Sequence, residues 1–395
     1  MGFLGDPIKF IGDWLKSLIA PLNLPPVWET FLSTLTSVIA VASFGLLIVI
    51  FLIWVERKVA ARFQDRLGPN RAGKYGLLQT FADMVKLITK EDTTPETADK
   101  VVFNIAPVLS VVSVLLIWAV VPFAPTWFGT DINVGVLYIA AVGSFGILSI
   151  LMAGWSSNNK YALLGAFRAV AQLISYEVPM LIMLMVPVLL ASSMGMVDIV
   201  ARQDMWFIVV APLAAVVFLI SAIAEVGRTP FDLLEAESEI VAGFHTEYSG
   251  MKFGMFFAAE FLHIFTVGVL FAILFMGGWR GPGAEQFPLL GMVYLMAKST
   301  VGYFIAIWMR STLPRIRIDH MLAFNWKFLV PLSLAILIVT AILHKLFAAT
   351  TLYIPAMLVG NLVIFLASLG ALRAVAQRQR KQRKPFKKRP VAKAA

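Results

Sequence analysis

The sequence of 395 residues contains no cysteine. The chain therefore cannot form disulfides, supply a thiolate nucleophile or Cys ligands for zinc, or hold an all-cysteine iron–sulfur cluster. Charged residues are also scarce, at 14% of the chain compared with roughly 25% in ordinary soluble domains. Because 59% of the residues are hydrophobic and the mean hydropathy is +0.83, the composition excludes a soluble enzyme.

Familiar catalytic and nucleotide-binding motifs are missing as well. The sequence has no Walker A loop, dinucleotide-binding glycine fingerprint, nucleophile elbow or zinc-protease motif. The four histidines, which lack the spacing of metal ligands, are His245, His263, His320 and His344. We therefore expect no catalytic residue, metal, flavin or iron–sulfur cluster in this chain, so any redox centre must belong to a partner.

Long hydrophobic runs dominate the sequence instead. A membrane-spanning helix needs roughly 20 apolar residues. Runs of this kind occur at approximately 33–55, 103–121, 132–154, 173–194, 206–224, 256–276, 290–309, 325–346 and 353–372. The first begins too late, and is too long, for a cleaved signal peptide. The sequence predicts an all-α, polytopic bundle with about nine transmembrane helices.

Basic residues are distributed unevenly among the connections between these runs. Of the 33 Lys and Arg residues, 27 lie in alternate connections and in the C-terminal tail. The net charge of +10 would suggest nucleic-acid binding in a soluble chain, but in membrane proteins Lys and Arg gather on the cytoplasmic side. The pattern predicts a multi-pass protein with the N-terminus outside, the C-terminus in the cytoplasm, and no nucleic-acid partner.

The chain divides into four parts by composition. Residues 1–32 are an amphipathic segment, which predicts a helix lying in the membrane interface. Residues 33–346 form a membrane core of eight predicted spans, with large cytoplasmic connections at 56–102 and 225–255. Residues 347–377 hold the ninth span. Residues 378–395 form a basic tail, which we expect to be disordered and to rest on anionic lipid.

The amphipathic pattern is carried by two sets of apolar residues. In the N-terminal segment these are Phe10, Ile11, Trp14, Leu15, Leu18 and Ile19. In the first inner connection they are Leu78, Phe81, Val85 and Ile88, which recur at helical spacing. Membrane anchoring explains the first set. The second set, with basic residues around it, suits docking against a partner subunit or shielding a hydrophobic ligand.

Carboxylates within or beside the spans are an informative exception to the apolar composition. They are Glu56 at the end of the first span, Glu177 in the fourth, Glu225 at the end of the fifth, and Glu260 in the sixth. An ionised group at membrane depth costs about 2.5–3.5 kcal/mol on insertion scales, so each is a candidate functional residue. Buried, crowded carboxylates are suited to carry protons. One isolated Glu could equally be a structural partner of an arginine.

The connection between the fifth and sixth spans is unusually acidic. Between residues 225 and 247 it has six carboxylates and one formal positive charge, Arg228. Thr229-Pro230-Phe231-Asp232 resembles a helix start, with Thr as N-cap and Pro at the first helical position. Helical spacing would then place Asp232, Glu235 and Glu239 on one face. This face is either an ordinary solvated surface or one wall of a charged cavity.

Several stretches resemble the family of the H subunit of bacterial respiratory complex I, the counterpart of mitochondrial subunit 1. They are Glu56-Arg57-Lys58, residues 64–71, Lys160–Ala166, Arg168–Gln172, Ser175-Tyr176-Glu177, residues 224–248, Ala259-Glu260, Pro314-Arg315, Arg317 and Trp326-Lys327. Together they cover the four inner connections. Two features depart from the family pattern: His320 stands where a Gln is expected after Asp319, and the ninth span extends a common core of eight.

The resemblance implies a membrane subunit of a proton-translocating NADH:quinone oxidoreductase in the bacterial inner membrane. Its substrate, quinone, would be reduced by the iron–sulfur cluster of hydrophilic cytoplasmic subunits, while small and antiporter-like membrane subunits are further implied partners. Residues carried over to the quinone chamber are Arg57, Arg66, Arg228, Phe231, Asp232, Arg315 and Arg317. Residues carried over to an acidic proton path are Glu56, Glu177, Glu225, Glu235, Glu237, Glu247 and Glu260.

Three other functions remain open at this stage. A homologous membrane subunit of a hydrogenase or of another donor:quinone complex would share these features, because the membrane chain does not contact the primary electron donor. A stand-alone ion or proton transporter would also place acids at membrane depth, but it predicts repeated, broken spans. A purely structural scaffold would leave the acidic connection unexplained.

Overall fold

The computed structural model describes residues 25–234, 237–348 and 350–382. The longer helices in these ranges are α2 (Pro26–Phe63), α3 (Gln79–Thr89), α4 (Lys100–Ile117), α5 (Gly135–Ser156), α6 (Lys160–Ala191), α9 (Pro212–Val226), α11 (Gly250–Phe275), α12 (Pro288–Thr312), α14 (Val330–Phe347) and α15 (Tyr353–Gln382). The shorter ones are α7 (Met196–Ala201), α8 (Phe207–Val210), α10 (Glu237–Ile240) and α13 (Ile318–Phe324). The predicted all-α class is confirmed, while the amphipathic set Phe10–Ile19 lies outside the described residues.

Short helical turns complete the described part of the chain. The 3-10 turns are η2 (Lys74–Gly76), η3 (Trp118–Val120) and η4 (Gly243–His245), and η5 (Asn325–Leu329) is a π turn. The π turn lies directly before Pro331, whose missing N–H cannot continue the regular helix ladder. It joins α13 and α14 into one continuous span, Ile318–Phe347.

Eight helices in the described ranges are long and apolar enough to cross a membrane. They correspond to eight of the nine predicted runs. The remaining run, 206–224, is divided into α8 and α9 at Ala211, which has φ −131° and ψ 65°. Pro212 causes the break, because proline restricts the residue before it to non-helical conformations. Asn361 of α15 is buried against this break and donates a hydrogen bond to the carbonyl oxygen of Val210 at 3.3 Å.

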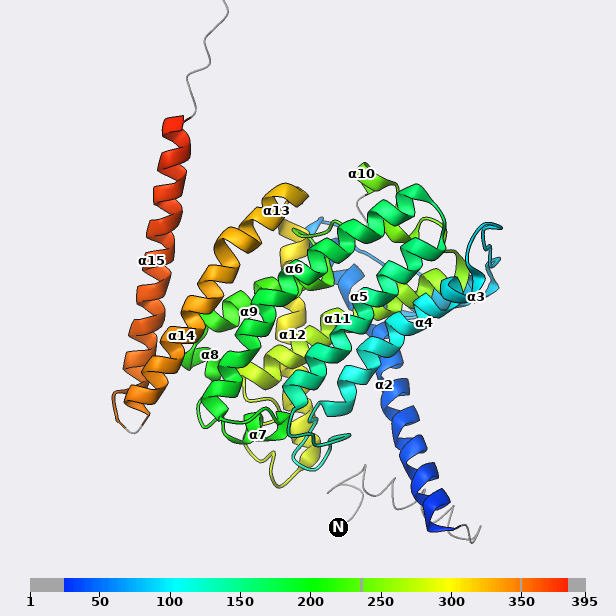
Figure 1. The fold of residues 1–395 in the computed structure, drawn as a ribbon. Helices are drawn as coiled ribbons and strands as arrows, with labels where there is room; N and C mark the ends of the chain where they lie inside the picture. The colour runs from blue at the N-terminus through cyan, green and yellow to red at the C-terminus, as the bar shows by residue number, and fades with distance from the viewer. Residues whose placement is uncertain (1–24, 235–236, 349, 383–395) are drawn as a thin grey trace, which may run out of the picture.

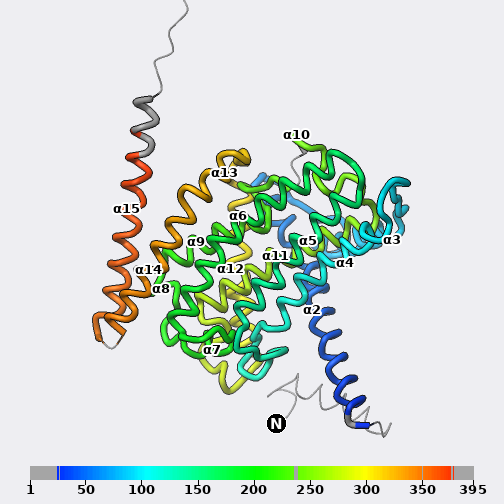
Figure 2. The backbone as a smooth tube through the Cα atoms, viewed as in Figure 1, coloured from blue at the N-terminus to red at the C-terminus, as the bar shows by residue number. Residues whose placement is uncertain are grey.

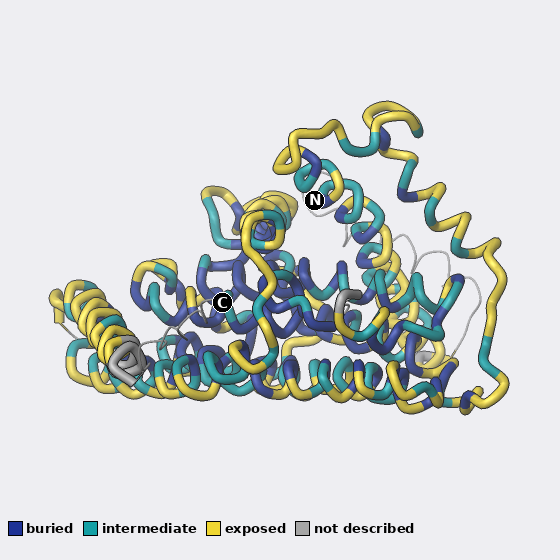
Figure 3. The backbone as a smooth tube through the Cα atoms, turned by 90° about the horizontal axis from the view of Figure 1, so that it is seen from above, coloured by how far each residue is buried: buried dark blue, intermediate teal, exposed yellow. Residues whose placement is uncertain are grey.

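Helix α11 lies at the centre of the bundle, and α15 lies at its edge (Figure 1). In the most apolar 18-residue stretch of each helix, 78% of the residues of α11 are buried, compared with 11% for α15. Seen from above, α15 is a nearly continuous exposed helix outside the buried centre (Figure 3). Gly268 of α11 faces Ser299 of α12, where a Cβ would lie only 2.7 Å from the Ser299 carbonyl oxygen. Small residues of this kind allow two membrane helices to approach closely.

The four connections predicted to be cytoplasmic contact one another, so they lie on one face of the bundle. Asn158 donates to the Thr97 carbonyl at 3.3 Å, Asn159 donates to Glu247 at 2.6 Å, and the backbone N–H of Ile316 donates to the Pro230 carbonyl at 3.0 Å. In Figure 1 the C-terminal end of α15 lies on the same side of the bundle as α10 and α13. The start of α2 lies on the opposite side (Figure 2).

The helix predicted to begin at Thr229 is absent, which corrects the sequence interpretation. Residues 229–234 form turns and irregular backbone that include a cis Thr229–Pro230 peptide bond, and helix α10 begins only at Glu237. The physical reason is burial: Phe231, Leu233 and Leu234 all pack into the interior, which a helix with one apolar face does not allow. Asp232 and Glu239 consequently have different partners, and Glu235 lies outside the described residues.

Candidate functional site

Four charged side chains from four parts of the chain meet around a buried pair, Glu56 and Arg228. Arg228 lies 3.3 Å (Nη1) from Oε1 of Glu56 and 2.8 Å (Nε) from Oε1 of Glu260. Arg310 forms a second ion pair with the same oxygen of Glu56. The side chains of Glu56 and Arg228 are each only 6% exposed. We call Glu56, Arg228, Glu260 and Arg310 the buried ion cluster.

The end of α9 places Arg228 in this cluster. Gly227 ends the helix in the left-handed conformation, at φ 76°, and so turns the chain inward. The Arg228 guanidinium then lies 4.8 Å from the ring centre of Phe261, a cation–π contact. Two acids and two arginines give the cluster no net formal charge, which is how buried charges are tolerated at all.

A second ion pair lies at the edge of the same face. Arg315 donates to Asp232 at 2.9 Å, and their side chains are 35% and 23% exposed. The neighbouring bond from Ile316 to Pro230 holds the two connections together. We call Asp232 and Arg315 the outer pair. Phe231, which precedes Asp232 in the sequence, is buried against Tyr176, with ring centres 5.2 Å apart.

Two side chains with positioning roles are missing from the predicted site residues. In the sequence, Arg310 is used only as one of the basic residues that indicate the cytoplasmic side. Its position in the last turn of an apolar span could have indicated a partner for a buried acid. Gln172 is fully buried and donates to the carbonyl oxygens of Ala224 and Phe231, at 2.8 and 2.7 Å. It therefore fixes both the end of α9 and the turn that follows. A glutamine in an apolar sequence does not by itself indicate this role.

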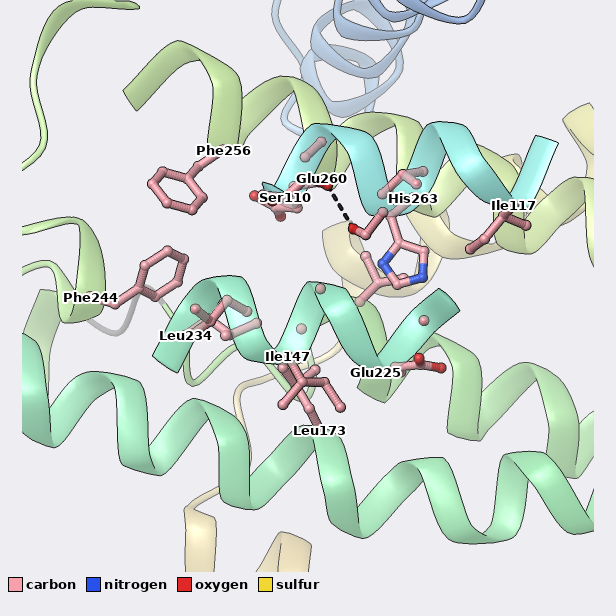
Figure 4. A pocket seen from close by; sticks show the side chains of 18 of the residues that line it. Ser110, Ile117, Ile147, Leu173, Glu225, Leu234, Phe244, Phe256, Glu260 and His263 are labelled. Atoms are coloured by element: carbon pink, nitrogen blue, oxygen red, sulfur yellow. Dashed lines mark hydrogen bonds between the residues drawn. The ribbon is translucent and has the colours of Figure 1, made fainter. Parts of the chain in front are cut away.

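Glu260 of the cluster lines a cavity inside the bundle, and a second, smaller cavity shares lining residues with the first. The larger cavity has a volume of about 90 Å³, and its polar lining includes Glu225, Glu260, His245 and His263. The smaller cavity, about 30 Å³, is lined by Glu177, Glu225 and His263. Figure 4 shows the Glu225, Glu260 and His263 side chains gathered around the larger cavity. The structure thus brings Glu56, Glu260, Glu225 and Glu177 into one connected series.

Glu239 and Glu247 of the acidic connection do not line either of the two cavities. Glu247 accepts a hydrogen bond from Asn159 at 2.6 Å, and Glu239 forms an ion pair with Arg168. Glu237 lies in α10, but its side chain is outside the described part of the structure. Glu239 and Glu247 fasten the connection to α6 and to the loop before it.

Burial perturbs two aromatic groups beside the larger cavity. Desolvation lowers the pKa of His245 to about 4, so its imidazole is neutral at pH 7. Desolvation also raises the pKa of Tyr248 to about 12. The Tyr248 ring stacks on Phe103 at 4.0 Å and its hydroxyl donates to the Phe103 carbonyl at 3.2 Å. Of the two, His245 lines the larger cavity, and its neutral imidazole keeps that part of the wall uncharged.

The basic residues of the first connection lie nearer to the surface. Arg57 forms an ion pair with Asp83 of α3. Although partial burial acts in the opposite direction, the hydrogen bond and charge of Arg57 hold the pKa of Asp83 below its ordinary value. Arg66 donates to Gln64 at 2.7 Å. In the last connection, Arg317 forms an exposed ion pair with Asp319.

Helix α3 confirms the helix predicted around residues 78–88. Leu78, Phe81, Val85 and Ile88 are 44% to 59% exposed. The described part of this chain therefore covers the stripe only partly. Within the described part of the chain, no group of three or more His, Asp or Glu side chains is placed so that it could hold a metal ion.

Comparison with known proteins identifies the family. The family model described as NADH dehydrogenase matches residues 36–341. The chain belongs to the NADH dehydrogenase family. The H subunit of the NADH-quinone oxidoreductase of Dehalococcoides mccartyi strain CBDB1 is 50% identical over 314 residues, covering 79% of this chain and 87% of the relative. The protein of the same name from Geobacillus kaustophilus is 45% identical over 337 residues, covering 85% and 99%.

The NADH dehydrogenase match includes the buried ion cluster, both cavities and the outer pair. Helix α15 lies beyond it. A further relative is the NADH-quinone oxidoreductase H subunit numbered 2 of Syntrophobacter fumaroxidans, which is 46% identical over 329 residues with 97% of its own length covered. The resemblance found in the inner connections is confirmed by matches that extend over most of the chain.

Proposed function

We propose that this chain is a membrane subunit of an NADH:quinone oxidoreductase, forming the membrane-side part of the quinone chamber and an acidic path that couples quinone reduction to proton translocation. The observation that carries the proposal is the buried ion cluster, whose Glu260 lines a cavity together with Glu225, while Glu225 and Glu177 line a second cavity. Charge at this depth is costly, so its retention indicates function. The names of the relatives support quinone as the substrate.

The proposed quinone chamber is supported by the positions of three arginines, which differ in how deeply they are buried. Arg228 is buried, while Arg57 and Arg315 are partly exposed on the face formed by the connections. Guanidinium groups stabilise negative charge, which builds up on a quinone oxygen as electrons arrive. We assign the chamber to these three residues together with Arg66, Phe231, Asp232 and Arg317.

The proton side rests on the series of carboxylates. Reduction of a quinone to a quinol consumes two electrons, which arrive from the partner subunits, and two protons. Protons withdrawn from side chains near the quinone leave those side chains more negative, so the charge next to the cluster changes. We propose that this change alters the pairing of Glu56 and Glu260 with Arg228, and that protons then move by way of Glu225 and Glu177. Moving one charge across the membrane costs about 2.3 kcal/mol per 100 mV, so coupling requires a switch. Residues Glu235, Glu237 and Glu247 would extend this path.

We place the chain in the bacterial inner membrane with the four connections and the C-terminus in the cytoplasm. Because the sequence has no cysteine, single cysteines can be introduced without removing others. Lys74→Cys lies in the first connection and Asp131→Cys lies between α4 and α5, and both positions are exposed. An impermeant thiol reagent should label the second from outside intact cells and the first only after lysis. The reverse pattern contradicts this orientation.

The assembled partners provide the test of function. Affinity purification of the chain from its native membrane should recover hydrophilic iron–sulfur subunits and further membrane subunits, among them the antiporter-like ones. The preparation should oxidise NADH with quinone as acceptor. Hydrogen oxidation in place of NADH oxidation would favour the related hydrogenase, and a chain that purifies alone while moving ions would favour a transporter.

A further inference from the structure

The two cavities share His263 in addition to Glu225. His263 lies on α11, three residues after Glu260, so helical geometry places both side chains on the same face. Of the titratable side chains in the described part of the chain, only Glu225 and His263 line both cavities. In the view of Figure 4 the imidazole lies between the carboxylates of Glu260 and Glu225. It therefore occupies the junction between the buried ion cluster and the deeper acids.

The cavities are large enough to hold water, so the side chains at their junction affect how a proton could pass from one cavity to the other. The larger, at about 90 Å³, has room for several water molecules, and the smaller, at about 30 Å³, for one or two. Most of the larger cavity's lining is apolar, including Val114, Ile117 and Ile147. Apolar walls do not hold water in place, so a proton crossing this space needs polar side chains along its walls.

We propose that His263 is a proton relay between Glu260 and Glu225, alongside direct transfer between carboxylates through water. This inference rests on the proposed function, since it names one more residue of the same path. The four carboxylates alone leave the apolar part of the larger cavity to be crossed by water. The imidazole supplies a donor and an acceptor there, on opposite sides of one ring.

The transfer step conserves charge and atoms. A proton from the Glu260 side forms a new N–H bond at one ring nitrogen, and the N–H bond at the other nitrogen breaks as its proton passes to the Glu225 side. The ring then holds one proton, as before, but in the opposite tautomer. Rotation of the ring or a proton of the next cycle restores the first tautomer. No oxidant or further reactant is needed.

The test compares two substitutions of His263 in the intact complex. His263→Leu removes both ring nitrogens at similar volume, and His263→Gln keeps hydrogen bonding but cannot exchange protons in this way. A relay contributes typically about 100-fold or more. Because direct transfer between Glu260 and Glu225 through water remains as a parallel route, we expect a loss of about tenfold in coupled quinone reduction for both variants. Reduction of a hydrophilic acceptor by the peripheral subunits should be unchanged.

The control is His344→Gln. His344 also lies in a membrane span, but its Nδ1 pairs with the Tyr353 hydroxyl at 2.9 Å, at the α14–α15 turn and outside both cavities. Its activity should equal that of the wild type. The solvent deuterium isotope effect on quinone reduction should rise in His263→Gln and not in His344→Gln, because only the former makes proton transfer slower. A merely structural role of His263 would not change this ratio.

Two other results would overturn the proposal. If His263→Gln keeps the wild-type rate and isotope effect while Glu225→Gln abolishes coupling, the acidic path stands and the relay is wrong. If Glu225→Gln also keeps full coupling, the proposed path itself fails. Should His263→Leu not assemble, His263→Gln still decides between these results.

Discussion

The buried ion cluster and the outer pair consist of the same chemical groups in different surroundings. In the cluster, Glu56 and Arg228 are 6% exposed, whereas Asp232 and Arg315 are 23% and 35% exposed. An exposed pair contributes about 0–1 kcal/mol because water and salt screen it. A buried pair stabilises little overall, yet removing one partner leaves an uncompensated charge at great cost. The difference shows that depth, and not residue type, decides how tightly these charges constrain the molecule.

The largest effect is expected from Arg228→Met. This change removes the guanidinium that contacts both Glu56 and Glu260, and so breaks the ion pair of Glu260 with Arg228. Breaking a buried pair costs about 3–5 kcal/mol. Thermal unfolding of the purified complex, or the yield of assembled complex, measures this loss. If Arg228→Met is as stable as the wild type, burial does not make the cluster more sensitive to the loss of one charge than the outer pair is.

A smaller effect is expected from acidification, which creates a buried charge at His245. Its pKa is about 4 in the folded protein, against an ordinary 6.5. Between these values the unfolded chain binds more protons, so stability falls as the pH drops from 6.5 toward 4, by about 3 kcal/mol in all. His245→Gln has no such proton to bind. Its stability profile should be flatter over that window, and identical profiles would contradict the assignment.

Arg310→Gln should cost less than Arg228→Met. Glu56 keeps its contact with Arg228, and the Arg310 side chain is 41% exposed, so water replaces part of what is lost. Loss of one hydrogen bond to a charged group predicts about 1.5–3 kcal/mol, reduced here by exposure. Comparing the unfolding temperatures of the two variants checks the order. An Arg310 variant less stable than the Arg228 variant would place the centre of the cluster at Arg310.

The smallest effect is expected from Arg315→Ala. The outer pair is partly exposed, so its loss should change stability by about 1 kcal/mol or less, and by less still at high salt. Urea unfolding at low and high ionic strength measures both effects. Quinone affinity is a separate readout, because the proposed chamber role predicts that it weakens even though stability hardly changes. A loss as large as that of Arg228→Met would remove the contrast between the two regions.

The sequence predicts the helices well, because long apolar runs and the α3 stripe have clear periodicity. It fails at residues 206–234, where tertiary contacts override local signals. Pro212 can be seen in the fifth run. The break that it causes is accommodated by a contact distant in sequence, because Asn361 of α15 donates a hydrogen bond to the Val210 carbonyl oxygen. Likewise, Thr229-Pro230 suggests a helix start, whereas burial of Phe231 imposes a turn.

The site is predicted in part. Glu56, Arg228 and Glu260 are all candidates from the sequence, but Arg228 is assigned to the quinone chamber and the two acids to the proton path. Spacing in the sequence cannot show that these three side chains meet. Arg310 and Gln172 are missed for the same reason: their roles depend on contacts with residues 254 and 52 positions away, respectively. The assignments to a quinone chamber and a proton path remain proposals.

The central claim is that the acids beyond the buried ion cluster couple quinone reduction to proton movement. The most direct test is the ratio of protons translocated to NADH oxidised in sealed vesicles containing the Glu225→Gln complex, with Glu285→Gln, an exposed residue, as the matched control. We predict that Glu225→Gln lowers coupled quinone reduction and proton translocation while reduction of a hydrophilic acceptor stays normal. Unchanged quinone turnover and an unchanged proton ratio in that variant would contradict the account.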